Sequence, residues 1–281
     1  MISLAGKAAL ITGGSRGIGA ATVKLFAQAG ADVVFNYHRN REAAELVEQE
    51  ARKHSTRVES FKADLGKMAN AKKLVDFVRE RLGRLDILVA NAGIWNEQDT
   101  PIEKLTEHEW DEMIRVNLKS VYAVIHYAVP HMIAQKGGRI VAISSTAGQR
   151  GEAFHSHYGA SKGAIISFVK GLASELAGHN ILVNCVAPGW VDTDMSASVL
   201  HKKAGMKSAL EMCIRDRRCP ARTLPGQTAR APRQPCLNRF CVPPVCERAF
   251  TPRRISNLST NASASMARIS LTRISRPLGL A

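Results

Sequence analysis

The segment "LITGGSRGIGAA" (residues 10–21) runs from an apolar stretch into the start of an amphipathic one, and it carries Gly13, Gly17 and Gly19. Glycine adopts positive φ without strain and lets a backbone approach a phosphate or a packed strand closely. A helix that begins here would also present free N–H groups and its positive dipole end to an anion. The segment therefore predicts a strand-to-helix turn that binds phosphate, and a tight turn without a ligand is the alternative.

Over residues 1–200, short apolar runs alternate with amphipathic ones. Six apolar runs predict strands, and they cover residues 7–12, 32–37, 57–62, 86–91, 138–144 and 181–187. Residues 17–31, 40–54 and 73–83 show helical spacing, with Asn40 as an N-cap and Gly83 as a stop signal. This alternation predicts an α/β fold, a Rossmann-like doubly wound parallel sheet with helices on both faces.

The formal net charge of +15 comes almost entirely from the C-terminal part of the chain. Residues 1–201 hold 23 of the 39 Lys and Arg and 21 of the 24 Asp and Glu, so that part is nearly neutral. Residues 202–281 also hold five of the six cysteines and eight of the eleven prolines, and no period of 2 or 3.6 runs through them. We therefore expect a folded domain over residues 1–201 and an aperiodic, basic, disordered tail over residues 202–281.

Three interpretations of this tail compete. A basic arm for nucleic acid would use its many arginines, but they are not clustered and few aromatic residues accompany them. A zinc module would use Cys236, Cys241 and Cys246, but no Cys-x2-Cys pair is present and no His follows His201. We favour a non-native tail, read out of frame or derived from an adapter, since "EMCIRDR" (211–217) can be back-translated into a sequence that resembles a sequencing-library adapter end.

Several classes of partner and compartment are not expected. Cys185 is the one cysteine in residues 1–201, which suits a reducing compartment, and neither a signal peptide nor an apolar run of about 20 residues is present. We therefore expect a cytoplasmic protein that binds no membrane and no nucleic acid. No metal is expected either, because His155 and His157 form a His-x-His pair without further ligands.

The glycine spacing, Gly-x3-Gly-x-Gly after Thr12, resembles that of the short-chain dehydrogenase/reductase family, in its shorter single-domain branch. Further matches follow in order along the chain, namely Asp64 in "ADL", "NAG" (91–93), Asn117 in "VNL", Ser144 and Ser145, Tyr158 and Lys162 in "YGASK", and "PGWVDTDM" (188–195). Ala90 stands where the family usually has a first Asn. The overall pattern is similar to that of bacterial 3-oxoacyl-[acyl-carrier-protein] reductases.

This resemblance implies a catalytic set of Asn117, Ser145, Tyr158 and Lys162. Tyr158 and Lys162 are four residues apart on a predicted helix, so their side chains reach one face. Tyr158 would exchange a proton with the substrate oxygen, and the positive charge of Lys162 would lower the pKa of the phenol. Ser145, or its neighbour Ser144, would hold the substrate oxygen, and Asn117 would hold a water in a proton relay to Lys162.

The resemblance also implies a nicotinamide dinucleotide. An acidic residue at the end of the second strand would select NAD(H), but Tyr37 stands there, and Arg16 and Arg39 could bracket a 2′-phosphate. NADP(H) is therefore expected in preference to NAD(H), although Arg39 as a solvated loop residue is the alternative. The predicted cofactor-binding set is Thr12, Gly13, Ser15, Arg16, Gly17, Ile18, Gly19, Tyr37, Arg39, Asp64, Leu65, Asn91, Ala92, Gly93, Tyr158, Lys162, Pro188, Gly189, Val191 and Thr193.

The implied reaction is hydride transfer between the nicotinamide and a carbonyl or secondary-alcohol substrate, with a 3-oxoacyl thioester as one option. Trp95 would pack either on the substrate or on the protein. The family's substrate-covering helices and last strand have no counterpart in the sequence, so we expect the sheet to lack its last strand. The family suggests a homotetramer or dimer, which the altered C-terminus puts in doubt. The alternatives to an active enzyme are a catalytically impaired cofactor-binding remnant and a protein that binds nucleic acid through its tail.

Overall fold

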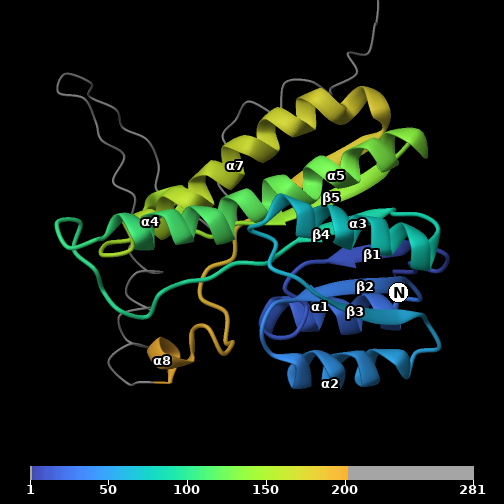
Figure 1. The fold of residues 1–281 in the computed structure, drawn as a ribbon, viewed down its shortest axis with the longest axis horizontal. Coiled ribbons are helices and arrows are strands. Elements are labelled where there is room, and N and C mark those ends of the chain that lie inside the picture. The colour runs from blue at the N-terminus through green and yellow to red at the C-terminus, as the bar shows by residue number, and fades with distance from the viewer. Residues whose placement is uncertain (1, 202–281) are drawn as a thin grey trace, which may run out of the picture. The chain divides into compact units, whose positions relative to one another are not determined.

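The computed structural model describes residues 2–201 of the chain (Figure 1). The six strands are β1 (Ala8–Ile11), β2 (Asp32–Tyr37), β3 (Val58–Lys62), β4 (Ile87–Ala90), β5 (Gly138–Ile143) and β6 (Ile181–Val186). The α-helices are α1 (Gly17–Gln28), α2 (Arg41–Arg52), α3 (Met68–Leu82), α4 (Glu107–Ile114), α5 (Ser120–Ala134), α6 (Ala147–Arg150), α7 (Ser156–Leu176) and α8 (Ala197–Leu200). A π-helical turn, η1 (Arg115–Lys119), joins α4 to α5, and a 3-10 turn, η2 (Ala177–His179), follows α7. The predictions for residues 202–281 lie outside the described residues.

All six predicted strands are present and form one parallel sheet in the order β3-β2-β1-β4-β5-β6. The chain leaves β1 toward β2 and β3 on one side and returns to β4, β5 and β6 on the other, so β1 and β4 lie at the point where the winding reverses. In a doubly wound sheet, ligands bind outside the carboxyl ends of the strands at such a point. Among residues 2–201 the sheet ends at β6, and no seventh strand is found in that range.

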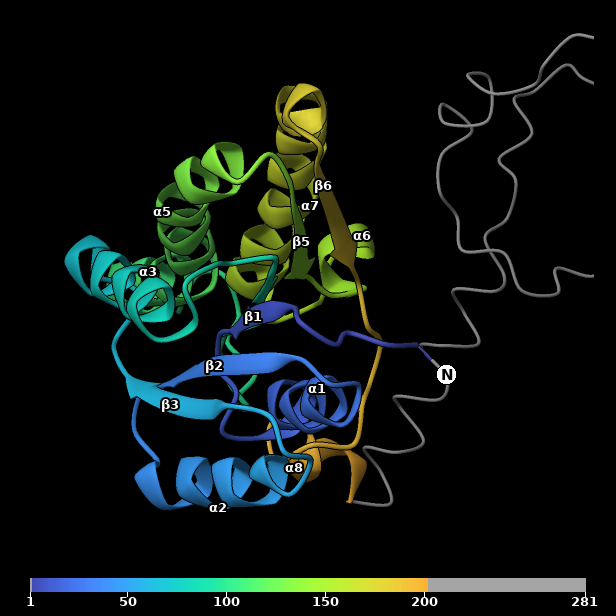
Figure 2. The same ribbon diagram turned by 90° about the vertical axis from the view of Figure 1, so that its right-hand side faces the viewer.

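Helices cover both faces of the sheet (Figure 2). Residues of α3, α5 and α7 pack with Ala8 and Leu10 in one core, whereas residues of α1 and α2 pack with Ala9 and Ile11 in the other. Successive side chains of a strand point to opposite faces, so β1, buried along its whole length, supplies both cores in alternation. The Rossmann-like doubly wound fold predicted from the sequence is confirmed.

The residues predicted to begin and end helices, Asn40 and Gly83, do so in the structure. Asn40 Oδ1 accepts a hydrogen bond from the Ala43 N–H at 2.9 Å, which caps α2. Gly83 ends α3 with φ of 74°, in the left-handed region that glycine adopts without strain. No helix in residues 2–201 is long and apolar enough to cross a membrane.

Gly19 allows α1 to pack directly on the loop before it, because a Cβ at this position would overlap the Gly13 carbonyl oxygen. We expect Gly19→Ala to lower the free energy of unfolding by ~1–3 kcal/mol, the usual cost of overpacking, and to weaken dinucleotide binding. Thermal denaturation and titration with NADPH would measure the two effects.

The matched control is Gly171→Ala on α7, where an added Cβ would meet no atom within 4 Å. There the loss of a helical glycine should stabilise the protein by up to ~1 kcal/mol. Equal melting temperatures for the two variants would contradict this account of Gly19.

Candidate active site

The loop after β1 is held open for a ligand by its glycines. Gly13 and Gly17 have φ of 67° and 53°, and a Cβ at Gly17 would stand 3.3 Å from the Thr193 side chain. Gly14 lies so close to Phe35 that a Cβ would approach its ring to 2.7 Å. The N-cap of α1 is Arg16, whose side chain makes no capping hydrogen bond. The first turn of α1 thus remains available to an anion, as the glycine spacing predicted.

The Thr12 hydroxyl joins the ends of β1 and β4. Its Oγ1 accepts hydrogen bonds from the N–H groups of Asn91 and Ala92, both at 2.9 Å. In return, Asn91 Nδ2 donates to the carbonyl oxygens of Thr12 at 2.9 Å and Gly13 at 3.2 Å. Thr12 and Asn91, both predicted to bind the cofactor, therefore also fix the loop that would bind it.

Asn36 is a positioning residue that the sequence analysis did not single out. Its side chain is buried in β2, where Nδ2 donates to the carbonyl oxygens of Tyr37, Phe61 and Ala63 at 3.1, 3.3 and 3.0 Å. Its backbone oxygen accepts from Gly14 N–H at 2.9 Å. The signal in the sequence was an amide inside the apolar run "DVVFNY", which a buried strand tolerates only when that amide is hydrogen-bonded.

A cavity of about 710 Å³ opens at the carboxyl edge of the sheet. Most of the predicted site residues line it: Gly13, Ser15, Arg16, Gly17, Ile18, Tyr37, Arg39, Asn91, Ala92, Gly93, Ser145, Tyr158, Lys162, Pro188, Gly189, Val191 and Thr193. Five predicted residues are not among the lining residues, namely Thr12, Gly19, Asp64, Leu65 and Asn117. The lining also includes residues that the sequence analysis did not assign to the site, among them Asn36, His38, Glu112, Glu152 and Trp190.

The residues present fit a nicotinamide dinucleotide. The glycine loop leaves room for a pyrophosphate beside the start of α1, and Arg16 and Arg39 line the same cavity as His38 at the end of β2. At the other end the cavity reaches Ser145, Tyr158 and Lys162. The cavity thus spans from a phosphate cradle to a group that can exchange a proton.

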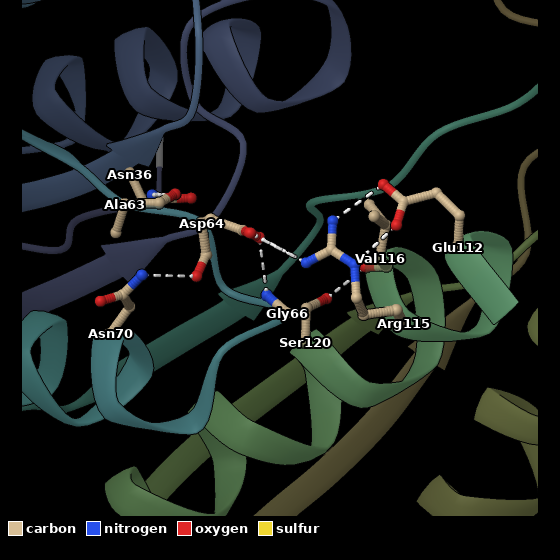
Figure 3. A network of polar contacts seen from close by, with 9 residues as sticks. All are labelled: Asn36, Ala63, Asp64, Gly66, Asn70, Glu112, Arg115, Val116 and Ser120. Atoms are coloured by element: carbon tan, nitrogen blue, oxygen red, sulfur yellow. Dashed lines mark hydrogen bonds and ion pairs between the residues drawn. The ribbon is translucent and has the colours of Figure 1, made fainter. Parts of the chain in front are cut away.

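Asp64, predicted to hold the adenine, is engaged by Arg115 (Figure 3). Arg115 Nη1 lies 2.9 Å from both carboxylate oxygens of Asp64, and Arg115 Nε and Nη2 bind Glu112 at 2.6 and 2.8 Å. Burial opposes the charged form of Asp64, but Arg115 and the Gly66 N–H outweigh it and hold the carboxyl pKa below its usual value. This network fastens the segment after β3 to α4 and η1, and it brings Glu112 to the cavity wall.

Asn117 lies in the π-helical turn η1, where it is fully buried. Its Oδ1 accepts from Ile94 N–H at 2.7 Å, and its Nδ2 donates to the Ile94 carbonyl at 3.0 Å and to Ser161 Oγ at 3.1 Å. The side chain thus clamps the segment after "NAG". The predicted water relay to Lys162 stays a prediction.

Tyr158, Ser145 and Lys162 come together at the start of α7 and the end of β5. The hydroxyl of Ser145 hydrogen-bonds with Tyr158, whereas that of Ser144 donates to the Lys162 carbonyl at 2.7 Å. Lys162 Nζ donates to the Ile143 carbonyl at 3.0 Å and lies 5.9 Å from the centre of the Tyr158 ring. Of the two serines considered, Ser145 is thus the one that faces Tyr158.

The two histidines that flank this loop have different surroundings. His155 is held by backbone, with Nε2 2.8 Å from the Asn96 oxygen and Nδ1 3.2 Å from the Ala153 oxygen. His157 is buried, and neither of its ring nitrogens has a hydrogen-bond partner among the described residues. Within residues 2–201, no group of three or more His, Cys, Asp and Glu side chains is placed to hold a metal ion.

Comparison with known proteins agrees with this geometry. A family model described as short chain dehydrogenase matches residues 7–204. The chain belongs to the short-chain dehydrogenase family. The 3-oxoacyl-[acyl-carrier-protein] reductase FabG of Thermotoga maritima is 40% identical over 199 residues, 71% of this chain and 80% of that protein. Versicolorin reductase stcU of Emericella nidulans is 43% identical over 197 residues, 70% of this chain and 73% of that protein.

A solved structure shows the same fold in this family. Carveol dehydrogenase from Mycobacterium avium, in complex with NAD, superposes with a TM-score of 0.68 at 30% identity, over 73% of this chain and 79% of that one. As a short-chain dehydrogenase, the protein is an oxidoreductase that acts on carbonyl or alcohol substrates with a nicotinamide dinucleotide. The resemblance seen in the sequence is thereby confirmed.

Tyr158 and Lys162, which are predicted to take part in proton exchange, have shifted pKa values. Burial raises the pKa of Tyr158, the Ser145 hydrogen bond opposes that rise, and the charge of Glu152 adds to it. Burial lowers the pKa of Lys162 from 10.5 to about 8. The phenol is therefore protonated at neutral pH. The lysine loses its proton at a lower pH than an exposed lysine does.

Tyr158→Phe removes the one phenol at the end of the cavity while keeping its ring. Turnover should fall more than ~10-fold, which corresponds to a barrier increase above ~1.4 kcal/mol, while cofactor binding persists. Steady-state rates and NADPH fluorescence would be compared with those of Tyr122→Phe, a tyrosine half-exposed on α5. A Tyr158→Phe enzyme that keeps more than a tenth of the wild-type rate would exclude the phenol as the proton donor.

Lys162→Met tests the buried charge. The folded pKa of about 8 lies below the unfolded 10.5, so between these pH values the unfolded chain binds more protons and the free energy of unfolding rises with pH. The wild type should therefore gain stability relative to Lys162→Met from pH 8 to 10.5. Denaturant titrations at several pH values would measure this gain, with the exposed Lys170→Met on α7 as control, and parallel curves for wild type and Lys162→Met would contradict it.

Proposed function

We propose that this chain is an NADP(H)-preferring oxidoreductase in which Asn117, Ser145, Tyr158 and Lys162 form the catalytic set. The observation that carries the proposal is the hydrogen bond of Tyr158 to Ser145 beside a buried Lys162, in the cavity that begins at the glycine loop. A proton donor, an oxygen-binding hydroxyl and a phosphate cradle then share one space. This is the arrangement that carbonyl reduction needs.

The residues act on the carbonyl oxygen. A bound reduced nicotinamide would supply the hydride for the carbonyl carbon. Ser145 donates a hydrogen bond to the carbonyl oxygen and stabilises the charge that develops there. Tyr158 gives its proton to that oxygen, and Lys162, when protonated, stabilises the phenolate that remains. Alcohol oxidation runs through the same groups in reverse.

Preference for NADP(H) rests on the end of β2. Tyr37, His38 and Arg39 line the cavity there, and the position that would carry a carboxylate against a 2′-phosphate is Tyr37. Arg16 lies in the glycine loop and lines the same cavity. Two guanidinium groups suit a phosphate because their donors form planar forks.

The substrate class is a carbonyl compound or its alcohol. The FabG relative is named a 3-oxoacyl-[acyl-carrier-protein] reductase, which supports a 3-oxoacyl thioester as one substrate to test. An apolar groove of Ile114, Leu118, Tyr122, Ala164 and Phe168 supports the homodimer or homotetramer expected from the resemblance. The competing proposal, a cofactor-binding remnant without activity, would bind NADPH but reduce no ketone.

The cofactor preference can be tested at the two arginines. Arg39→Ala and Arg16→Ala should each raise the KM for NADPH about tenfold or more and change the KM for NADH little, because only NADPH carries the 2′-phosphate. Steady-state kinetics with both cofactors would measure this. A lower KM and a higher turnover with NADH in the wild-type enzyme would overturn the preference.

Arg41→Ala is the matched control. Arg41 is two residues further along, pairs with Glu45 at 2.7 Å on α2 and is not among the cavity-lining residues. Its KM values for both cofactors should stay at the wild-type level. A general loss of positive charge would instead affect all three variants alike.

A further inference from the structure

The mechanism above does not use the carboxylate of Glu152, one of several ionisable groups that line the cavity. Its side chain is only 17% exposed, and it lines the same cavity as Tyr158. Glu152 is close enough for its negative charge to stabilise the protonated form of Tyr158. Removing water from a carboxylate is costly, so a substrate that covers Glu152 in this cavity should offer it a hydrogen bond.

The protein holds this carboxylate in place from one side. Burial raises the pKa of Glu152, whereas His155, Trp95 and Arg150 oppose that rise, and His155 Nδ1 lies 3.8 Å from Glu152 Oε1. Trp95 is itself stacked on His155, with ring centres 4.9 Å apart and planes at 20°. The backbone oxygens of Ala153 and Asn96 hold His155, and His155 in turn fixes the position of the Trp95 ring stacked on it.

Trp190 completes the surroundings from the segment after β6. Its ring meets Trp95 edge to face, with centres 5.8 Å apart and planes at 89°. Both tryptophans and Glu152 line the cavity, together with Asn96. Aromatic rings with a carboxylate and an amide combine apolar faces with hydrogen-bonding groups, which suits a molecule that has both C–H and O–H surfaces.

A carboxylate has about four lone-pair positions, and His155, Trp95 and Arg150 stabilise its charge from the protein side. An alkyl chain laid against the cavity side of Glu152 would displace water from the carboxylate without replacing its hydrogen bonds, which costs free energy. A cationic substrate would instead have to enter a cavity that the buried Lys162 also lines. Neutral hydroxyl groups satisfy the carboxylate without that repulsion.

We propose that Glu152 is a specificity-determining residue that accepts a hydrogen bond from a hydroxyl group next to the reacting carbonyl, so that the preferred substrates are hydroxylated ketones of the ketose type and their polyols. This inference rests on the proposed oxidoreductase function and names the substrate class of the same site. It selects against an unsubstituted acyl chain at that position.

Two ketones test the inference in the full chain with NADPH. 1-Hydroxy-2-butanone and 3-pentanone differ by one hydroxyl in place of a methyl group. A site built for a hydroxyl rejects the analogue that lacks it by large factors, so the wild type should prefer the hydroxyketone at least ~10-fold in kcat/KM. Glu152→Leu should abolish this preference while kcat/KM for 3-pentanone holds or rises. Glu152→Gln, which keeps one acceptor oxygen, should retain part of the preference.

Glu97 offers a matched control, because it is an exposed carboxylate in the same loop as Trp95 and is not among the cavity-lining residues. Glu97→Leu should leave the preference unchanged. A wild-type enzyme that favours 3-pentanone, or a Glu152→Leu enzyme with the wild-type ratio, would overturn the inference while leaving the proposed function intact.

A binding measurement keeps the test independent of turnover. Xylitol cannot be reduced, so its binding to the enzyme–NADPH complex can be followed by tryptophan fluorescence, with 1-pentanol as the apolar comparison. Xylitol should bind to the wild type and lose about tenfold or more of its affinity in Glu152→Leu. Binding of xylitol without reduction of any ketone would support the Glu152 site and contradict the proposed function, and equal binding to both proteins would contradict the Glu152 site.

Discussion

The hydroxyl of Thr12 is the point on which the rest of the site depends, because it joins the two strands between which the winding of the sheet reverses. One oxygen accepts the N–H groups of Asn91 and Ala92 just after β4, while the amide of Asn91 reaches back to the end of β1. Because these strand ends are joined, the start of the glycine loop is held in a fixed position. The close approach of Gly19 to the Gly13 carbonyl then sets where α1 begins, and with it the place for a phosphate.

At the opposite end of the cavity, the same edge of the sheet buries the ammonium group of Lys162, and this burial costs free energy. Lys162 has its Nζ on a backbone carbonyl and no carboxylate as a close partner among the described residues, and burial lowers its pKa to about 8. A residue chosen for stability alone would not be a lysine. Its position beside Tyr158 agrees with the role in proton exchange proposed for it.

Much of this arrangement could be predicted from the sequence because it depends on local patterns. Strand positions follow from apolar runs, Asn40 and Gly83 mark helix ends by their own backbone preferences, and the glycine loop has a spacing of its own. Parallel strands end at a common edge, so residues that follow strands were expected to meet there. The predicted roles of individual residues remain predictions.

Other parts of the site depend on contacts between distant segments, which local patterns do not encode. Arg115 reaches Asp64 across 51 positions of the sequence, and Trp190 meets Trp95 from a different loop. Glu152 looks like an ordinary surface carboxylate until Trp95 is placed against it. Asn36 is the exception, since an amide inside the apolar run "DVVFNY" is a local pattern that indicates a hydrogen-bonded role.

The π-helical turn η1 joins the segment after β3 to the segment after β4 through two of its residues. Arg115 binds the segment after β3, and Asn117 clamps the segment after β4. A π-turn holds more residues per turn than an α-helix does. In an α-helix, each residue advances the chain by about 100° around the helix axis. Loss of a single residue here would rotate α5 against α4 and separate the two contacts. Evolution of this protein should therefore accept substitutions in the turn more readily than insertions or deletions, and the length of the segment is constrained as well as its composition.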